Sequence, residues 1–234
     1  MKKNIIIIFL LQAFILKIVA QEENFVKDID GNTYKTIEIG SYMWMAENLK
    51  TTCYNDGTEI PNIKEGEIWL NLKTGAYCWY NNDTSYAMKY GAFYNWYAVH
   101  TEKLCPEGWH VPTDEEWKYL EGFVDSRFNI GDTIWNHVRN RGHDAGLQLK
   151  ATYGWKREGN GPDHFKFSAL PGGERCSGPR FFQEEVSGFW WSSTEGDSLR
   201  AWYRNVFYDY ELIFRETHPK YFGFSVRCVK ENKL

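Results

Sequence analysis

The sequence predicts an α+β domain, because strand-like segments lie near both ends of the chain and an amphipathic helix lies between them. The helical signal is the spacing of three or four residues that separates Trp117, Leu120, Phe123 and Val124. The strand signal is a change to a period of two after residue 187. This order favours an N-terminal hairpin that pairs near the C-terminal strand.

The first twenty residues have the features of a secretory signal peptide. A short basic start precedes an apolar run from Ile5 to Leu16, and the segment ends at a small residue, Ala20. The run is too short for a membrane span, and Lys17 interrupts it. We therefore expect a single mature domain, residues 21–234, that is secreted, periplasmic or on the cell surface and has no membrane span.

The charge balance argues against nucleic acid as a partner. Removing residues 1–20 leaves 24 basic and 31 acidic side chains, which gives the mature chain a net charge of −7. Phosphate backbones are bound by basic surfaces, which this composition does not favour. The chain also contains no Walker or dinucleotide loop, no H-E-x-x-H and no G-x-S-x-G sequence, so we expect no catalytic residues.

Local patterns predict the elements in order. Residues 33–45 read as a hairpin with a Gly-Ser turn. Residues 92–99 are dense in aromatic rings and fit a buried short helix or a strand. A weaker helix covers residues 143–152, and residues 154–187 hold many glycines and prolines and read as a long loop region.

The C-terminal third reads as strands. Four short segments alternate in the manner of strands: residues 188–194, 201–209, 210–216 and 222–229. Phe224, Val226 and Cys228 would share one face of the last segment. In the first segment, alternation places one ring of Trp190 and Trp191 inside and the other outside. An outward ring beside Arg204 or Arg175 could stack on a sugar, and ring packing between strands is the other reading.

Residues 105–117, CPEGWHVPTDEEW, combine a cysteine, a histidine and three acids, and therefore resemble a metal or acid–base site. Thr113 and Glu116, however, have the spacing of a capping box at a helix N-terminus. Asp114 and Glu115 then occupy the first turn, where the helix dipole favours negative charge. One cysteine and one histidine cannot make a zinc site, so this stretch predicts a helix start.

Calcium is the one cofactor that the sequence suggests, because acidic side chains of the chain could supply oxygen ligands for it. Residues 28–32 resemble part of a calcium loop, but Gly31 comes too early for the loop glycine and Ile39 stands where glutamate is required, so we expect a turn. Acids from distant loops could still gather around an ion: Asp163, Glu195, Asp197, Asp209 and Glu211.

Five cysteines remain in the mature chain: Cys53, Cys78, Cys105, Cys176 and Cys228. In an exported protein they can form disulfides, and the odd number leaves at least one thiol free or paired between molecules. Spacing alone does not decide the pairing.

Seven segments occur in order along the chain: DIDGNTYKTIEIG, WMAENLK, YGAFYNWYAV, CPEGWHVPTDEEW, FSALPGGER, GFWWSSTE and YFGFSVRCVK. Together they span residues 28–230 and closely resemble the Fibrobacter succinogenes major paralogous domain, an exported bacterial family. That family resembles the C-type-lectin-like fold and, more distantly, the formylglycine-generating enzyme group. The resemblance implies two main helices, a twisted antiparallel sheet and a long irregular loop region.

The same resemblance implies a disulfide. Lectin-like folds commonly tie the start of a helix region to the last strand, and Cys105 and Cys228 are the cysteines in those places. Cys53 and Cys78 are then the second candidate pair, which leaves Cys176.

Two departures bear on function. The related copper enzymes would need a cysteine where this chain has Gly223, and the sugar-binding calcium signatures E-P-N, Q-P-D and W-N-D do not occur. We therefore expect a non-enzymatic binding domain for extracellular glycan or protein, with these candidate ligand-binding residues: Trp155, Asp163, Arg175, Trp191, Glu195 and Arg204. The alternatives are an enzyme of the formylglycine-generating type with another centre, and a structural surface or assembly module with contacts through Cys176 or exposed aromatic residues.

Overall fold

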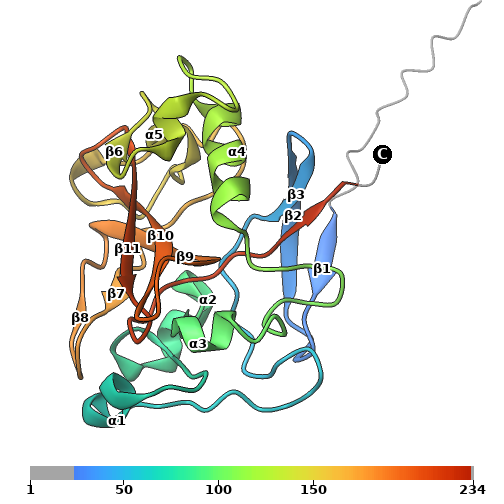
Figure 1. The fold of residues 1–234 in the computed structure, drawn as a ribbon, viewed down its shortest axis with the longest axis vertical. Helices are drawn as coiled ribbons and strands as arrows, with labels where there is room; N and C mark the ends of the chain where they lie inside the picture. Colours follow the sequence, from blue (N-terminus) through green and yellow to red (C-terminus); the bar gives the residue numbers. More distant parts are fainter. Residues whose placement is uncertain (1–23, 233–234) are drawn as a thin grey trace, which may run out of the picture.

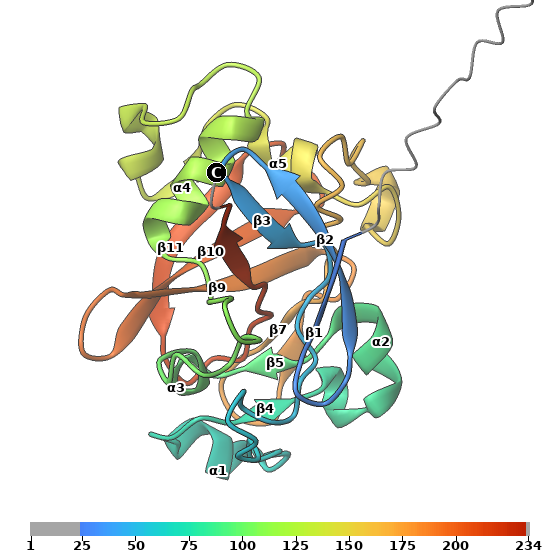
Figure 2. The ribbon, with the colours of Figure 1, turned by 90° about the vertical axis from the view of Figure 1, so that its right-hand side faces the viewer.

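The fold is an α+β domain of short helices and antiparallel strands (Figure 1), here a computed structural model that describes residues 24–232. The predicted signal peptide, residues 1–20, lies outside the described residues. In Figures 1 and 2, α1, α2 and α3 lie at one end of the molecule, and α4 and α5 lie at the other. No helix within residues 24–232 has the length and apolar character needed to cross a bilayer.

The strands are β1 (Phe25–Lys27), β2 (Thr33–Ile39), β3 (Tyr42–Met45), β4 (Tyr77–Cys78), β5 (Phe93–Tyr94), β6 (Arg139–Arg141), β7 (Glu174–Arg175), β8 (Phe181–Phe182), β9 (Ser187–Glu195), β10 (Arg200–Phe207), β11 (Ile213–Pro219) and β12 (Val229–Glu231). The α-helices are α1 (Gly66–Asn71), α2 (Ala87–Tyr90), α3 (Trp96–Val99), α4 (Asp114–Val124) and α5 (Ala145–Leu149).

The first sheet has the order β1-β2-β3-β12, so it pairs strands from the N-terminal part of the chain with the last strand. The predicted hairpin is confirmed as β2 and β3, which pair Ile37 with Trp44 across the sheet. Its turn uses Gly40, whose φ of 61° is a left-handed conformation that favours glycine. On the other edge of β3, Val229 of β12 also pairs with Trp44, so the expected pairing of the hairpin with the C-terminal strand is confirmed.

The second sheet has the order β6-β11-β10-β9, and three of the predicted strand segments form β9, β10 and β11. Alternation gives this sheet two different faces. Trp190, Val206 and Ile213 point toward a core that they share with α4 and α5. Phe189 and Tyr203, one residue out of phase, belong to a separate aromatic cluster on the opposite face. The predicted last strand is shorter than expected: it makes isolated bridges before β12 begins at Val229.

Helix α4 begins as the sequence predicts. Thr113 Oγ1 accepts a hydrogen bond from the Glu116 N–H at 3.2 Å, and Glu116 Oε2 accepts one from the Thr113 N–H at 2.8 Å. The expectation of two main helices is wrong, since the described residues contain five α-helices and α5 has only 5 residues. The remaining helices end after one or two turns because tertiary packing, and not a long apolar stripe, holds them.

The aromatic segment of residues 92–99 uses both predicted conformations in succession. β5 pairs with β4, and α3 follows after a single residue, Asn95. The Asn95 side chain accepts hydrogen bonds from the N–H groups of Ala76 and Ala98, at 3.0 and 3.1 Å. One buried side chain therefore ends the strand and caps the helix.

A buried ionic network joins α4 to the second sheet. Asp114 Oδ1 accepts hydrogen bonds from Arg204 and Arg215, each at 2.8 Å, and Glu121 accepts from Arg204 and from Arg141. The side chains of Glu121, Arg141 and Arg204 are 0% exposed. Burial acts to raise the pKa of the Asp114 carboxyl, but the hydrogen bonds and charges of Arg215 and Arg204 outweigh it and hold that pKa below its usual range.

Replacing Glu121 by glutamine should lower the free energy of unfolding by about 3–5 kcal/mol, because the buried guanidinium of Arg141 loses its carboxylate partner and that of Arg204 loses one of its two. Denaturant titration at pH 7 measures the change. Glu115→Gln is the matched control, since this side chain on the same helix is 80% exposed; its effect should stay below about 0.5 kcal/mol. Equally small effects in both variants would contradict a structural role for the network.

The disulfide between Cys105 and Cys228 is confirmed, and it links residues 123 positions apart. It connects the segment before α4 to the residue that precedes β12. The second predicted bridge is wrong, because Cys53 and Cys78 are free thiols, as is Cys176. Cys78 is buried in an apolar cluster with Trp69, whereas Cys53 lies in a loop bridge to Glu59.

Removing the bridge in a Cys105→Ser, Cys228→Ser double variant should destabilise the fold by about 4–5 kcal/mol in the chain-entropy description of such a long closed loop. Denaturant titration of purified protein measures the loss. Cys53→Ser supplies the control for a cysteine substitution outside the bridge, and it should remain close to the parent protein. A double variant as stable as this control would refute the assignment.

Candidate functional site

Four of the six predicted ligand-binding residues lie in the interior. The exposed fractions are 5% for Trp155 and 0% for Arg175, Trp191 and Arg204. Their hydrogen-bonding groups are used within the protein: Trp155 donates to the Ala169 carbonyl, and Arg204 belongs to the ionic network. These four residues therefore do not form part of a binding surface. Asp163 is partly buried and Glu195 is exposed.

The expectation that one ring of the Trp190–Trp191 pair faces outward is wrong. Trp190 Nε1 donates to Asn48 Oδ1, and Trp191 Nε1 donates to the Tyr94 carbonyl, both at 2.9 Å. Both rings are buried because β9 has a hydrophobic core on each of its faces at this point. Alternation along a strand indicates opposite faces, but it does not indicate that one of them meets water.

The acidic positions are distributed among separate turns. Asp28 accepts a hydrogen bond from the Asn32 N–H at 2.9 Å, so residues 28–32 form the predicted turn. Asp163 accepts from the Ser168 N–H at 2.8 Å, and Glu195 pairs with Lys220. Across residues 24–232 the structure gathers no group of three His, Cys, Asp or Glu side chains that could hold a metal ion.

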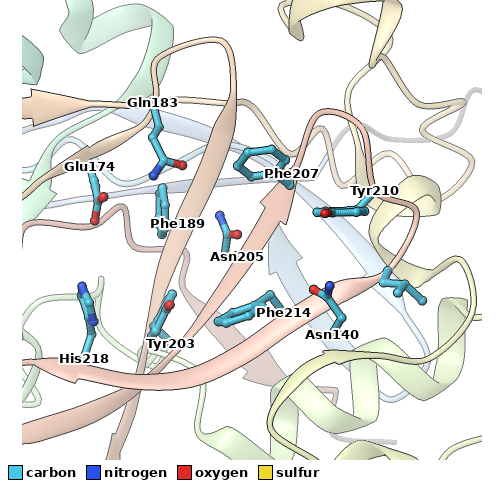
Figure 3. A pocket seen from close by; sticks show the side chains of 11 residues that line it. Asn140, Glu174, Gln183, Phe189, Tyr203, Asn205, Phe207, Tyr210, Phe214 and His218 are labelled. Carbon is cyan, nitrogen blue, oxygen red and sulfur yellow. The ribbon is translucent and has the colours of Figure 1, made fainter.

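The outer face of the second sheet carries a hollow of about 370 Å³ (Figure 3), which we call the aromatic hollow. Strands β9, β10 and β11 form its floor, and β7 and the chain after β8 form one end. Its lining residues are Asn140, Glu174, Gln183, Phe189, Tyr203, Asn205, Phe207, Tyr210, Leu212, Phe214 and His218. Sheet alternation brings several of them together, because Asn205 pairs with both Phe189 and Phe214 in the register of the sheet.

Aromatic rings line the hollow from end to end. Phe189 and Tyr203 stack with ring centroids 6.1 Å apart, and Phe214 lies 6.2 Å from Tyr203. At the other end, Phe207 and Tyr210 have centroids 5.7 Å apart, and Tyr210 is 50% exposed. The hollow therefore presents several ring surfaces, some of them accessible to a ligand.

Polar groups at one end of the hollow lack protein partners. Glu174 is only 8% exposed. Its carboxyl nevertheless forms no hydrogen bond or ion pair with any residue of the range 24–232. The hydroxyl of Tyr203 and the side-chain amide of Gln183 likewise bond to no described residue. Gln183 is exposed, and the sealed side-chain atoms that lack a partner lie elsewhere in the described residues, at Trp44, Asn82, Tyr90 and Ser187. The polar atoms of this cluster are therefore open to the hollow. Glu174 is the exceptional member, because a carboxyl on a residue this buried normally has a partner.

Burial changes the ionisation of this end of the hollow. Desolvation raises the pKa of the Glu174 carboxyl to about 7. Desolvation, followed by the positive charge of Arg200, lowers the pKa of His218 to about 4. At neutral pH the imidazole is therefore uncharged, and the carboxyl is divided between its acid and carboxylate forms.

Two other hollows are larger, but both contain polar groups that are used to begin α4. One, of about 520 Å³, lies beside α4 and includes Thr113 and Glu116, which cap that helix. The other, of about 480 Å³, includes His110, which bonds to Glu116 at 2.7 Å, and Thr194, which accepts from the Asp114 N–H. The aromatic hollow is therefore the better candidate for a ligand site.

Sequence reasoning missed this site, although part of the signal was present. The period of two in β10 places Tyr203, Asn205 and Phe207 on one face, which is an aromatic and amide surface. Glu174 could not be found in this way, because it lies in the segment read as a long loop. Only the pairing of β7 with β8, with Glu174 opposite Phe182, locates it at the hollow.

The fold and the hollow define an α+β domain with an aromatic cleft on one sheet face. The family model described as the Fibrobacter succinogenes major domain matches residues 37–230, so the chain belongs to this family. No curated protein and no solved structure gives a significant match to the chain.

Replacing Glu174 by glutamine should change how stability depends on pH. The folded protein holds the carboxyl proton more tightly than the unfolded chain, so this residue's contribution is present below about pH 4.5 and is lost as pH rises through about 7. Between pH 5 and pH 8, the stability of Glu174→Gln relative to the parent should therefore rise by about 2–3 kcal/mol. Denaturant titrations at both pH values test this, and a constant difference would contradict it.

Proposed function

We propose that this protein is an exported, non-enzymatic binding domain and that it binds an extracellular glycan in the aromatic hollow. The observation that carries the proposal is the combination of exposed ring surfaces with hydrogen-bonding groups that have no protein partner. Sugar rings have apolar C–H faces that pack on aromatic rings, and their hydroxyls bond to amide and carboxyl groups. The hollow supplies both kinds of surface at a size near the lower end of small-molecule sites, about 300–1,000 Å³.

Binding is favoured over hydrolysis by the composition of the hollow. Glycoside hydrolysis generally uses two carboxyl groups on opposite sides of the bond that is cleaved. Glu174 is the one carboxyl among the described residues that line this hollow. A single acid between aromatic rings fits recognition better than cleavage.

Two further features support an exported domain with a lectin-like fold. The disulfide between Cys105 and Cys228 suits an oxidising compartment and agrees with the signal peptide expected in residues 1–20. The same bridge, together with the pairing of β3 and β12, supports the proposal that the domain has a C-type-lectin-like fold. Because some lectin-like proteins bind sugar through calcium, binding is to be measured with calcium and with a chelator.

The first test is a broad glycan array, followed by calorimetry with any glycan that binds. Phe207→Ala and Tyr210→Ala should each weaken binding about tenfold, because each removes a ring surface of the hollow. Tyr153→Ala is the matched control, since this tyrosine is 61% exposed and lies outside the aromatic hollow. Its affinity should equal that of the parent protein.

The proposal is wrong if no glycan on the array binds with or without calcium. It is also wrong if the control variant loses as much affinity as Phe207→Ala and Tyr210→Ala, because the ligand would then lie elsewhere.

A further inference from the structure

We propose that the aromatic hollow recognises a sugar that carries a free, protonated amine, and that this amine forms an ion pair with Glu174. The inference rests on the proposed glycan-binding function and narrows its ligand class. It is carried by a buried carboxyl that points into the hollow and has no partner among the described residues.

The backbone explains why Glu174 points into the hollow. Glu174 and Arg175 are consecutive residues of β7, so their side chains leave opposite faces of the strand. Arg175 enters the interior, where its guanidinium lies 4.2 Å from the centroid of the Trp69 ring and donates to the Lys64 carbonyl. Glu174 consequently faces the hollow, at the end where Figure 3 also shows Phe189, Tyr203 and His218.

A carboxylate in this position has no protein counter-charge. The lining contains no lysine or arginine, and its one basic residue, His218, is uncharged at neutral pH. Two more charged residues lie near this end, Arg200 and Glu216. Their charges, like that of Glu174, act on the pKa of the Tyr203 hydroxyl. The cost of desolvation is visible in the pKa of Glu174, which burial raises to about 7. The attraction of a cation placed beside this carboxyl would offset that cost.

The neighbouring rings favour the same charge. The face of an aromatic ring has a negative potential and attracts cations. Phe189 and Tyr203 lie at the Glu174 end of the hollow and stack on each other. A ligand carboxylate would meet both the rings and Glu174 unfavourably, and a neutral hydroxyl would leave the ionised carboxyl without a counter-charge. An ammonium group is therefore the best match.

The remainder of the hollow fits the rest of an amino sugar. The side chains of Gln183, Asn205 and Asn140 supply amide donors and acceptors for hydroxyl groups. Phe207, Phe214 and Tyr210 supply ring surfaces for the C–H faces of adjoining sugar units. The length of the hollow away from Glu174 thus suits a short oligosaccharide better than an isolated amine.

The test compares three sets of oligosaccharides of equal length by calorimetry at pH 7: glucosamine oligomers with free amines, their N-acetylated counterparts, and uronic acid oligomers. The parent protein should bind the free-amine oligomers at least about tenfold more tightly than the N-acetylated ones, and the uronic acids most weakly. Glu174→Gln should remove the preference for the amine while the N-acetylated oligomers still bind.

Glu216→Gln is the matched control. It removes the same charge from the neighbouring strand β11, but Glu216 does not line the hollow. This variant should keep the preference of the parent protein. Retention in Glu216→Gln and loss in Glu174→Gln would assign the preference to one carboxyl and not to net charge.

Proton release supplies a second readout. Pairing with a cation converts the protonated fraction of Glu174, whose pKa is about 7, to carboxylate, while any unprotonated ligand amine takes up a proton. The readout is therefore made at pH 6, where the sugar amines already carry most of their protons and Glu174 is mostly protonated. At this pH the parent should release most of a proton more than Glu174→Gln when it binds a glucosamine oligomer. Calorimetry in buffers with different ionisation enthalpies measures this difference. Equal release by the two proteins would overturn the ion pair.

The two proposals fail in different ways. Binding of N-acetylated or anionic oligomers as tight as that of the amines, or an amine preference that survives in Glu174→Gln, would overturn this inference and leave glycan binding in place. If none of the three sets binds, the proposed function fails and the inference fails with it.

Discussion

The buried ionic network between α4 and the second sheet is the constraint on which the rest of the domain depends. Asp114 and Glu121 lie on one side of the helix, and arginines from β6, β10 and β11 reach them across the core. Charges can be buried only when they are paired and hydrogen-bonded, so the network permits few orientations of helix on sheet. It also places the arginines of the central strands on the inner face, which leaves the outer face free for aromatic and amide side chains.

The aromatic hollow exists because the two faces of the second sheet carry different kinds of side chain. Arg204 and Arg215 pair across β10 and β11 on one face, and the adjacent pair, Asn205 and Phe214, lines the hollow on the other. The contrast between the faces is chemical as well as geometric. On the inner face the carboxylates of Asp114 and Glu121 are paired with arginines, whereas Glu174 at the outer face has no partner among the described residues. This difference makes the hollow, and not the network, the place for a ligand.

Features with local causes could be predicted from the sequence. The capping box of α4 involves residues three apart, and the hairpin of β2 and β3 depends on a short turn and alternating side chains. The bridge between Cys105 and Cys228 was accessible through the family resemblance. The interior positions of Arg175, Arg204 and Trp191 were not accessible, because burial depends on what covers each face. Arginine and tryptophan suit an exposed binding surface and a paired interior equally well.

By itself, the sequence determined the α+β class, the start of the main helix, the central strands and the family, because these depend on periodicity, capping and ordered motifs within short segments. Only the tertiary structure decided which faces of those strands meet water and which meet a second core. It also brought Glu174 of a two-residue strand to the face that presents Phe189, Tyr203 and Asn205. The physical reason is that a site is made by contacts between residues far apart in the chain, and no local pattern encodes such contacts.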